Sequence, residues 1–224
     1  QSAPSLILKD IHETKALADI ILGNRPKEDF YKLFEGKTTA NFDVDIHLLK
    51  VGVVNQTTML ATETQEIADF IRTTMIKKFG ASEIKDHFAD TRDTLCYATN
   101  DNQNATLGLL DVDADAAIVV GGYNSSNTTH LVELLEPKFI TFFIRNVNDI
   151  KSSEEIHHFD IRKKTENITS PFLPKSKKPT FIITSGASCP DAMVDRVIHE
   201  ILSFYTLTKD FSEVLKETEA RYVF

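Results

Sequence analysis

Three apolar stretches along the chain are each followed by a short run of small polar residues and then by a helical pattern of apolar positions. Continuous apolar runs of this length, rich in β-branched residues, are typical of buried parallel strands. Strands that alternate with helices predict an α/β fold with mostly parallel sheets. The expected strands are His47–Val54, Ala116–Val120 and Thr180–Ile183, and the polar runs that follow them are Asn55–Thr58, Asn124–Thr129 and Thr184–Ser188.

Helical and strand patterns in the rest of the chain predict two consecutive small three-layer α/β domains. We place them at residues 1–91 and 92–204, followed by a partly helical tail at 205–224.

The charged, proline-containing segment Lys151–Pro179 is expected on the surface, and adjacent His157 and His158 on a strand would face opposite ways rather than share a metal. The other expected helices are 13–22, 28–34, 62–79, 100–110, one from 131 onward and 191–204, and the other expected strands are 6–9, 83–88 and 139–144.

The polar runs predict an anion-binding site. Ligands of parallel α/β folds bind outside the carboxyl ends of the strands, where all three runs are expected. A helix N-terminus there presents free backbone N–H groups and the positive end of the helix dipole. Hydroxyl and carboxamide side chains add neutral donors, and the run 124–129 contains no lysine or arginine. The alternative is that these residues are ordinary helix caps without a ligand.

Composition narrows the function classes. The formal net charge of −8 argues against a nucleic-acid surface, and no apolar run is long enough to span a membrane. The first residues after Gln1 lack the profile of a signal peptide, and two cysteines cannot form a disulfide framework. We therefore expect a cytoplasmic protein, and we expect this chain to be part of a longer polypeptide.

Each of the two cysteines stands just before a predicted helix. Cys96 there is either a small core residue or a thiolate stabilised by the helix N-terminus, and Cys189 has a similar placement. The glycine-rich phosphate loops of nucleotide-binding enzymes and the nucleophile elbow of serine esterases have no match in the sequence. The sequence therefore gives no indication of nucleotide hydrolysis or of serine esterase chemistry.

Four sequence blocks carry a resemblance to a known family. In this order and spacing, VVNQTTML (53–60), DTLCYATNDNQNAT (93–106), VVGGYNSSNTTHLVEL (119–134) and ITSGASCPD (183–191) resemble the LytB/IspH family of hydroxymethylbutenyl diphosphate reductases. The resemblance extends from about residue 4 to residue 204. The sequences of these blocks look most like the branch of the family that includes plant and flavobacterial-type sequences.

The resemblance implies an iron–sulfur oxidoreductase of the non-mevalonate isoprenoid pathway, built of three α/β domains in a trefoil-like arrangement. Such enzymes remove the hydroxyl of an allylic diphosphate reductively, with a [4Fe-4S] cluster and with electrons from ferredoxin or flavodoxin. By motif match, Cys96 corresponds to a cluster ligand and Thr57 to the residue near the substrate hydroxyl. The positions that correspond to substrate-binding residues are Thr99, Ser125, Ser126, Asn127 and Ser188.

The chain also departs from the family pattern. The other two cluster cysteines, the substrate-binding histidines and the proton-delivering glutamate of the family have no counterpart here, and Asn102 replaces the usual arginine. We therefore expect this chain to be the last two of three domains, without its opening strand and inactive alone. Two alternatives remain: a diphosphate-binding or interaction module without a cluster, and a structural α/β module without a ligand.

Overall fold

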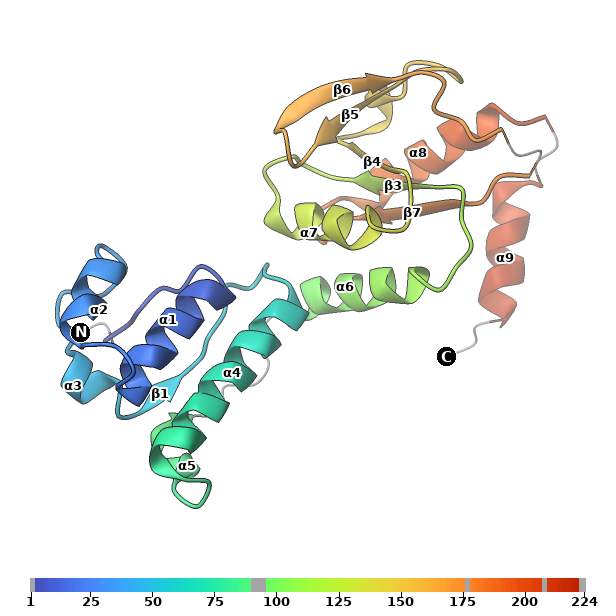
Figure 1. The fold of residues 1–224 in the computed structure, drawn as a ribbon. Helices are drawn as coiled ribbons and strands as arrows, with labels where there is room; N and C mark the ends of the chain where they lie inside the picture. Colours follow the sequence, from blue (N-terminus) through green and yellow to red (C-terminus); the bar gives the residue numbers. More distant parts are fainter. Residues whose placement is uncertain (1–2, 90–95, 176–177, 207–208, 222–224) are drawn as a thin grey trace. The chain divides into compact units, whose positions relative to one another are not determined.

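A computed structural model describes residues 3–89, 96–175, 178–206 and 209–221 (Figure 1). The chain divides into two compact units, residues 1–100 and 101–224, which are considered one at a time below. The predicted domain boundary between residues 91 and 92 lies outside the described residues. None of the described helices is both long enough and apolar enough to cross a membrane.

The first unit is mainly helical around an apolar core. Helices α1 and α4 pack side by side (Figure 1), and Leu17 and Ile21 of α1 share a buried cluster with Met75 of α4. The Asp10 side chain caps α1 by accepting hydrogen bonds from two backbone N–H groups, and Gly23 ends it in the left-handed conformation. The elements of this unit are α1 (Ile11–Leu22), α2 (Glu28–Leu33), α3 (Val44–His47), β1 (Val51–Gly52), α4 (Ala61–Phe79), α5 (Ile84–His87) and β2 (Phe88–Ala89).

The expected strands of the first unit are mostly not formed. The prediction of a strand at 47–54 is wrong at its start, because His47 ends the short helix α3 that Asp43 caps, and β1 begins only at Val51. The prediction at 83–88 is also wrong, since α5 occupies most of it and only Phe88 pairs, in β2, parallel to β1. Residues 6–9 form a single antiparallel bridge, between Leu6 and Thr38, instead of a strand.

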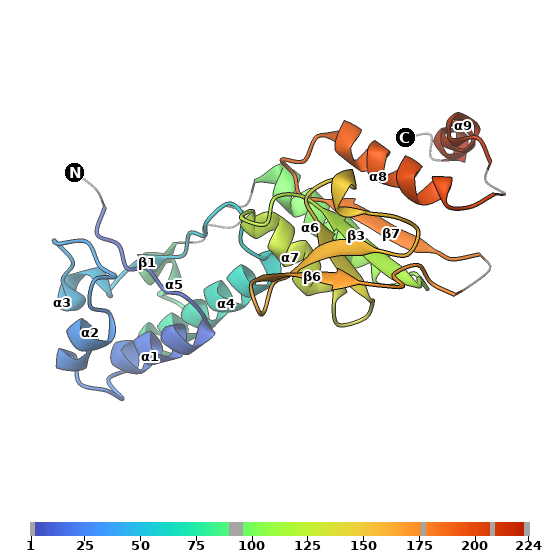
Figure 2. The same ribbon diagram turned by 90° about the horizontal axis from the view of Figure 1, so that it is seen from above.

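The second unit contains a parallel sheet of three strands in the order β4-β3-β7. The central strand β3 is buried at every position, as its continuous apolar sequence predicts. Side chains on one face pack against α7, and those on the other pack against α8, which runs beside β7 in Figure 2. The elements are β3 (Ala116–Val120), α7 (Ser126–Leu135), β4 (Thr141–Ile144), β7 (Phe181–Ser185), α8 (Asp191–Ser203) and α9 (Phe211–Arg221), and α6 (Tyr97–Leu109) crosses the division between the units.

The segment expected to be entirely on the surface contributes to the core. It contains an antiparallel hairpin, β5 (Ile156–Asp160) and β6 (Thr165–Thr169), preceded by the short 3-10 helix η1 (Val147–Asp149). Ile156 and Phe172 are buried against the face that α8 covers, so the prediction is wrong for these two positions. His157 and His158 do face opposite ways: one contacts Glu155 and the other packs edge-on against a core phenylalanine.

Taken together, the fold class expected from the sequence is confirmed. The strands of the central sheet and the pair β1 and β2 are parallel; α4 and α5 separate β1 from β2, and α7 separates β3 from β4. The antiparallel hairpin is the exception among the described strands.

Candidate functional site

Two of the polar runs meet at the carboxyl edge of the central sheet. The last residues of β3 and β7, Val120 and Ser185, are paired in register. The N–H of Gly186 donates to the carbonyl of Val120 at 3.1 Å, so the turn after β7 is held against the end of β3. Ser125 Oγ lies 3.8 Å from the position that a Cβ atom on Gly186 would occupy, which brings the two polar runs into contact.

Helix α7 begins earlier than the sequence pattern indicates, at Ser126 instead of Leu131. Ser125 is its N-cap, with an extended backbone and with Oγ accepting from the N–H of Thr128 at 3.3 Å. The hydroxyl of Thr129 donates to the carbonyl of Ser125 at 3.1 Å. Most of the predicted loop is therefore the first turn of the helix, where backbone N–H groups point outward from the helix end.

Asn127 is the polar residue with the most unusual environment in this turn. The residue is 4% exposed, and within the described part of the chain neither its carboxamide nitrogen nor its carboxamide oxygen has a hydrogen-bond partner. Buried polar atoms are nearly always paired, and leaving one unpaired costs about 1–3 kcal/mol. An orphaned carboxamide at a helix N-terminus indicates a place where a ligand would supply the missing partners.

Thr128, the next residue, packs between two glycines. A Cβ on Gly121 would lie 2.8 Å from Thr128 Oγ1, and a Cβ on Gly186 would lie 2.1 Å from the same oxygen. Atoms do not approach this closely, so both positions require glycine while Thr128 keeps its place. This contact joins the first turn of α7 to the ends of both β3 and β7.

Helix α6 is attached to the same edge. Asn102 Nδ2 donates to the carbonyl of Ser185 at 3.0 Å, and Thr106 Oγ1 lies 3.4 Å from Thr184 Oγ1. The carboxamide that replaces the arginine expected from the resemblance thus has a role of its own, because it holds α6 to the end of β7.

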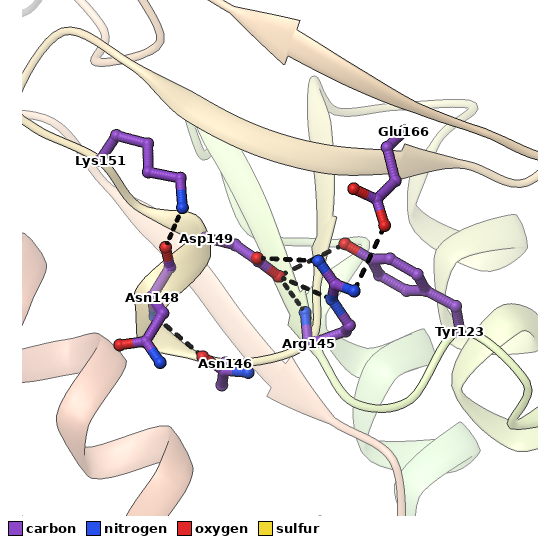
Figure 3. Close-up of polar contacts among 7 residues, drawn as sticks. All are labelled: Tyr123, Arg145, Asn146, Asn148, Asp149, Lys151 and Glu166. Carbon is purple, nitrogen blue, oxygen red and sulfur yellow. Dashed lines mark hydrogen bonds and ion pairs between the residues drawn. The ribbon is translucent and has the colours of Figure 1, made fainter.

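An aromatic and ionic cluster anchors the residue that precedes the polar run (Figure 3). The guanidinium of Arg145 lies 4.9 Å from the Tyr123 ring centroid. The Tyr123 ring also stacks on Phe159, which Figure 3 does not draw, with centroids 4.5 Å apart. Buried Asp149 accepts hydrogen bonds from the Tyr123 hydroxyl at 3.3 Å and from the Arg145 N–H at 2.8 Å. Glu166 adds an ion pair to Arg145 at 3.3 Å.

Burial and a neighbouring carboxylate keep the Tyr123 hydroxyl protonated. Burial, and secondarily the carboxylate of Asp149, raise the pKa of the Tyr123 hydroxyl well above its ordinary value. The Asp149 carboxylate also raises the pKa of Arg145. Tyr123 is therefore a permanent hydrogen-bond donor, and the cluster holds the start of the polar run against β4 and the hairpin.

The remaining predicted site residues lie elsewhere. Ser188 is exposed in the turn between β7 and α8, in the same unit as Ser125. Thr57, Cys96 and Thr99 belong to the unit at residues 1–100, so their part in a common site stays a prediction. Thr57 is exposed after β1, and Thr99 is buried on α6.

The two cysteines differ in environment. Cys96 is exposed, and its carbonyl accepts from the N–H of Asn100 at 2.9 Å at the start of α6, so the interpretation as a core residue is wrong. Cys189 is partly buried against the core on the α8 side of the sheet, and this burial raises the pKa of its thiol.

Comparisons with known proteins assign the family. The family model described as LytB protein matches residues 11–202. The chain belongs to the LytB family. It is 39% identical over 198 residues to the 4-hydroxy-3-methylbut-2-enyl diphosphate reductase of Synechococcus sp. (strain RCC307), and 40% identical over 199 residues to that of Prochlorococcus marinus (strain NATL1A). Each alignment covers 88% of this chain and 48% or 49% of the relative.

The chain thus spans about half the length of the curated LytB relatives it matches. Among solved structures it is similar to the E-1-hydroxy-2-methyl-but-2-enyl-4-diphosphate reductase of Plasmodium falciparum. That match has 22% sequence identity and a TM-score of 0.46, and it covers 76% of this chain and 50% of the other.

The [4Fe-4S] cluster implied by the family resemblance does not fit this chain by itself. Such clusters are held by three or four cysteine thiolates, and the chain has two cysteines. The described residues contain no group of three histidine, cysteine or acidic side chains that could hold a metal. Exposed Cys96 can supply one ligand, so further ligands would have to come from outside this chain.

Several residues of the site were not singled out by sequence reasoning. Thr128, Tyr123 and Asp149 act through packing and hydrogen bonds across the sheet edge, and no local motif marks such contacts. The sequence feature that could have indicated the Thr128 contact is the glycine after each strand, Gly121 and Gly186, because a glycine at a strand end often permits another segment to approach the backbone closely.

Replacement of Gly186 with alanine tests the contact with Thr128. We expect Gly186→Ala to lower the free energy of unfolding by about 1–3 kcal/mol in urea titrations, because the new Cβ overlaps the Thr128 hydroxyl. Gly108→Ala is the matched control: a Cβ there has no neighbour within 4 Å, and helix propensity predicts a gain of about 0.5–1 kcal/mol. The additional change Thr128→Ala is expected to relieve part of the loss; an unrelieved loss would contradict the contact.

Replacement of Tyr123 tests the anchoring cluster. We expect Tyr123→Ala to speed hydrogen exchange of the hydrogen-bonded amides of Ser125, Thr128 and Thr129 by about tenfold, because the ring no longer packs between Phe159 and Arg145. Tyr123→Phe keeps the ring and is expected to retain slow exchange, with a loss of about 1 kcal/mol in the free energy of unfolding. Equal exchange rates in the alanine variant and the unmodified chain would show that the cluster does not hold the loop.

Proposed function

We propose that this chain forms part of a reductase that removes the hydroxyl of 4-hydroxy-3-methylbut-2-enyl diphosphate, and that it contributes the site for the diphosphate group. The products would be isopentenyl and dimethylallyl diphosphates of the non-mevalonate isoprenoid pathway. The single observation that carries the proposal is the buried Asn127 carboxamide in the first turn of α7, which has no hydrogen-bond partner among the residues that the structure describes. The family membership and the names of the relatives support the reaction class.

The chemistry of the turn suits a diphosphate. Asn127 Nδ2 is a donor, the hydroxyls of Ser125 and Ser126 can donate, and the helix end contributes N–H groups and a positive partial charge. Neutral donors can bind a multiply charged anion without an opposing side-chain charge, as backbone amides do in other phosphate sites. Ser188, in the turn after the neighbouring strand, would complete the contacts from the second polar run.

The other catalytic elements are part of the same proposal. Thr57 would lie near the substrate hydroxyl, Thr99 would line the same pocket, and Cys96 would supply one ligand to a [4Fe-4S] cluster. The remaining cluster ligands would come from the part of the protein that the relatives have and this chain does not span. We place the complete enzyme in the cytoplasm, with ferredoxin or flavodoxin as the electron donor.

One observation favours a second candidate function. The described residues contain no metal-binding group of three side chains, which also suits a diphosphate-binding or interaction module that works without a cluster. The two candidates share the anion site and differ in redox chemistry.

Anaerobic reconstitution with iron and sulfide distinguishes the two candidates. This chain alone is expected to give no intact cluster and no turnover. If the first candidate holds, the chain together with the part of the protein that its relatives have and it does not span would give an intact cluster and turnover.

Binding of inorganic pyrophosphate to the full chain tests the anion site by calorimetry. We expect Asn127→Ala to weaken binding about tenfold or more, or by about 1.4 kcal/mol, through loss of a buried donor. The same change is expected to leave the free energy of unfolding unchanged or higher, because it removes a buried polar group without partners. Loss of affinity without loss of stability distinguishes a ligand contact from a structural one.

Asn104→Ala is the control for this measurement. Asn104 is exposed on α6, so its replacement makes the same chemical change away from the proposed contacts. If pyrophosphate affinity is the same in Asn127→Ala and in the unmodified chain, the turn is a helix cap and the anion site is refuted.

A further inference from the structure

We propose that Asn102 is a positioning residue for the diphosphate site: its carboxamide fixes the peptide group between Ser185 and Gly186, and through that group the two polar runs that would bind the anion. This inference rests on the proposed function and goes beyond it, because Asn102 acts through protein contacts and not on the ligand itself. Every residue that carries it lies in the unit at residues 101–224.

The peptide group that joins Ser185 to Gly186 is hydrogen-bonded on both of its sides. Its N–H, from Gly186, donates to the carbonyl of Val120 at 3.1 Å, and its carbonyl, from Ser185, accepts from Asn102 Nδ2 at 3.0 Å. The first bond comes from the neighbouring strand β3 and the second from helix α6. Because the N–H and the C=O point in opposite directions from one planar group, the two bonds together fix the rotation of that plane.

This peptide group sets the direction of the turn that follows β7. The N–H of Cys189 donates to the carbonyl of Gly186 at 2.8 Å, which closes a turn over residues 186–189 with Ser188 at its third position. Ser188 is exposed in this turn. A rotation of the peptide group before Gly186 would redirect the whole turn, so the position of the Ser188 hydroxyl depends on the Asn102 bond.

The same peptide group is packed against the first turn of α7. A Cβ on Gly186 would lie 2.1 Å from Thr128 Oγ1, so the backbone of Gly186 contacts the residue that follows Asn127. In a closely packed interior, a shift of Gly186 displaces Thr128 and, with it, the buried carboxamide of Asn127. One hydrogen bond from α6 therefore acts on donors of both polar runs.

Helix α6 has further attachments, so the Asn102 bond is not needed to keep the helix in place. One turn along the same helix face, Thr106 Oγ1 lies 3.4 Å from Thr184 Oγ1. Just beyond the C-terminal end of α6, Lys138 Nζ donates to the carbonyl of Val112 at 3.0 Å. The Thr106 contact joins two side chains, whereas the Asn102 bond is made to the backbone at the end of β7.

Binding of inorganic pyrophosphate to the full chain, measured by calorimetry, tests the proposal. We expect Asn102→Ala to weaken binding about fivefold or more, because the peptide group before Gly186 loses one of its two bonds. Thr106→Val is the matched control: it removes a hydroxyl from the same face of α6 and is expected to keep the affinity within about twofold. Equal affinity in Asn102→Ala and the unmodified chain, or an equal loss in both variants, would overturn the proposal.

Asn102→Asp distinguishes a hydrogen bond from side-chain packing. The two side chains have the same shape, but an ionised carboxylate cannot donate to the Ser185 carbonyl, whereas a protonated carboxyl can. Since only the neutral form makes this bond, the pKa of the introduced carboxyl is expected above its ordinary value. We expect Asn102→Asp to bind pyrophosphate about fivefold more weakly than the unmodified chain at about pH 7.5, and to regain at least about twofold at about pH 5.

The ratio of the two affinities is the quantity to compare across this pH range. The ionisation of pyrophosphate and of the other titrating groups is common to both proteins, so it cancels in the ratio. Lowering the pH protonates the introduced carboxyl, restores a donor to the Ser185 carbonyl and brings the ratio towards one. A ratio that does not change with pH would show that no hydrogen bond from position 102 is involved, and would overturn the proposal.

Hydrogen exchange without ligand separates a failed proposal from a failed diphosphate site. We expect Asn102→Ala to speed exchange of the amides of Gly186 and Cys189 about fivefold or more, because both belong to the turn that the bond holds. Unchanged exchange would overturn the positioning role whatever the affinity. If exchange is faster but Asn127→Ala binds pyrophosphate as tightly as the unmodified chain, the diphosphate site is refuted and the positioning role falls with it.

Discussion

The close packing of one threonine between two glycines is the constraint on which the candidate site depends. Thr128 stands in the first turn of α7, and its hydroxyl leaves no room for a side chain at the ends of β3 or β7. Because interiors pack at crystal density, such a contact fixes the spacing of the elements that meet there. The backbone bond from Gly186 to Val120 and the Asn102 bond to Ser185 act on the same edge. The polar run at residues 124–129 therefore begins at a position that these contacts hold fixed.

This rigidity makes it possible to tolerate an unsatisfied group. An orphaned carboxamide such as that of Asn127 would normally rotate or draw in a partner, yet Ser125 caps the helix and the Tyr123 cluster anchors the strand exit. In the proposed diphosphate site, a bound ligand would supply the missing hydrogen bonds to a side chain that is already held in place, as in a preorganised binding site. Neutral donors also suit a chain with a formal net charge of −8, because they attract an anion locally without a basic surface.

The sequence predicts best those elements whose pattern does not depend on distant partners. β3 is apolar at every position and its limits match, and the capped helix α1 lies close to its expected range. The start of α7 was missed because Ser125 reads equally as a loop residue or as an N-cap until the Thr128 contact is known. The burial of Ile156 was missed because its hairpin packs on the sheet through contacts far away in the sequence. The convergence of two polar runs was predictable from parallel topology, but the roles of Tyr123 and Asp149 were not.

The prediction of a strand at residues 47–54 was wrong for a different reason. A strand has no hydrogen bonds of its own, so a strand-like sequence specifies extended structure only where neighbours are present to pair with it. Asp43, just before this segment, caps a short helix that ends at His47, and pairing with β2 begins only at Val51 and Gly52. The wrong prediction therefore comes from a local helix cap that competes with a strand pattern whose pairing partners lie far away in the sequence.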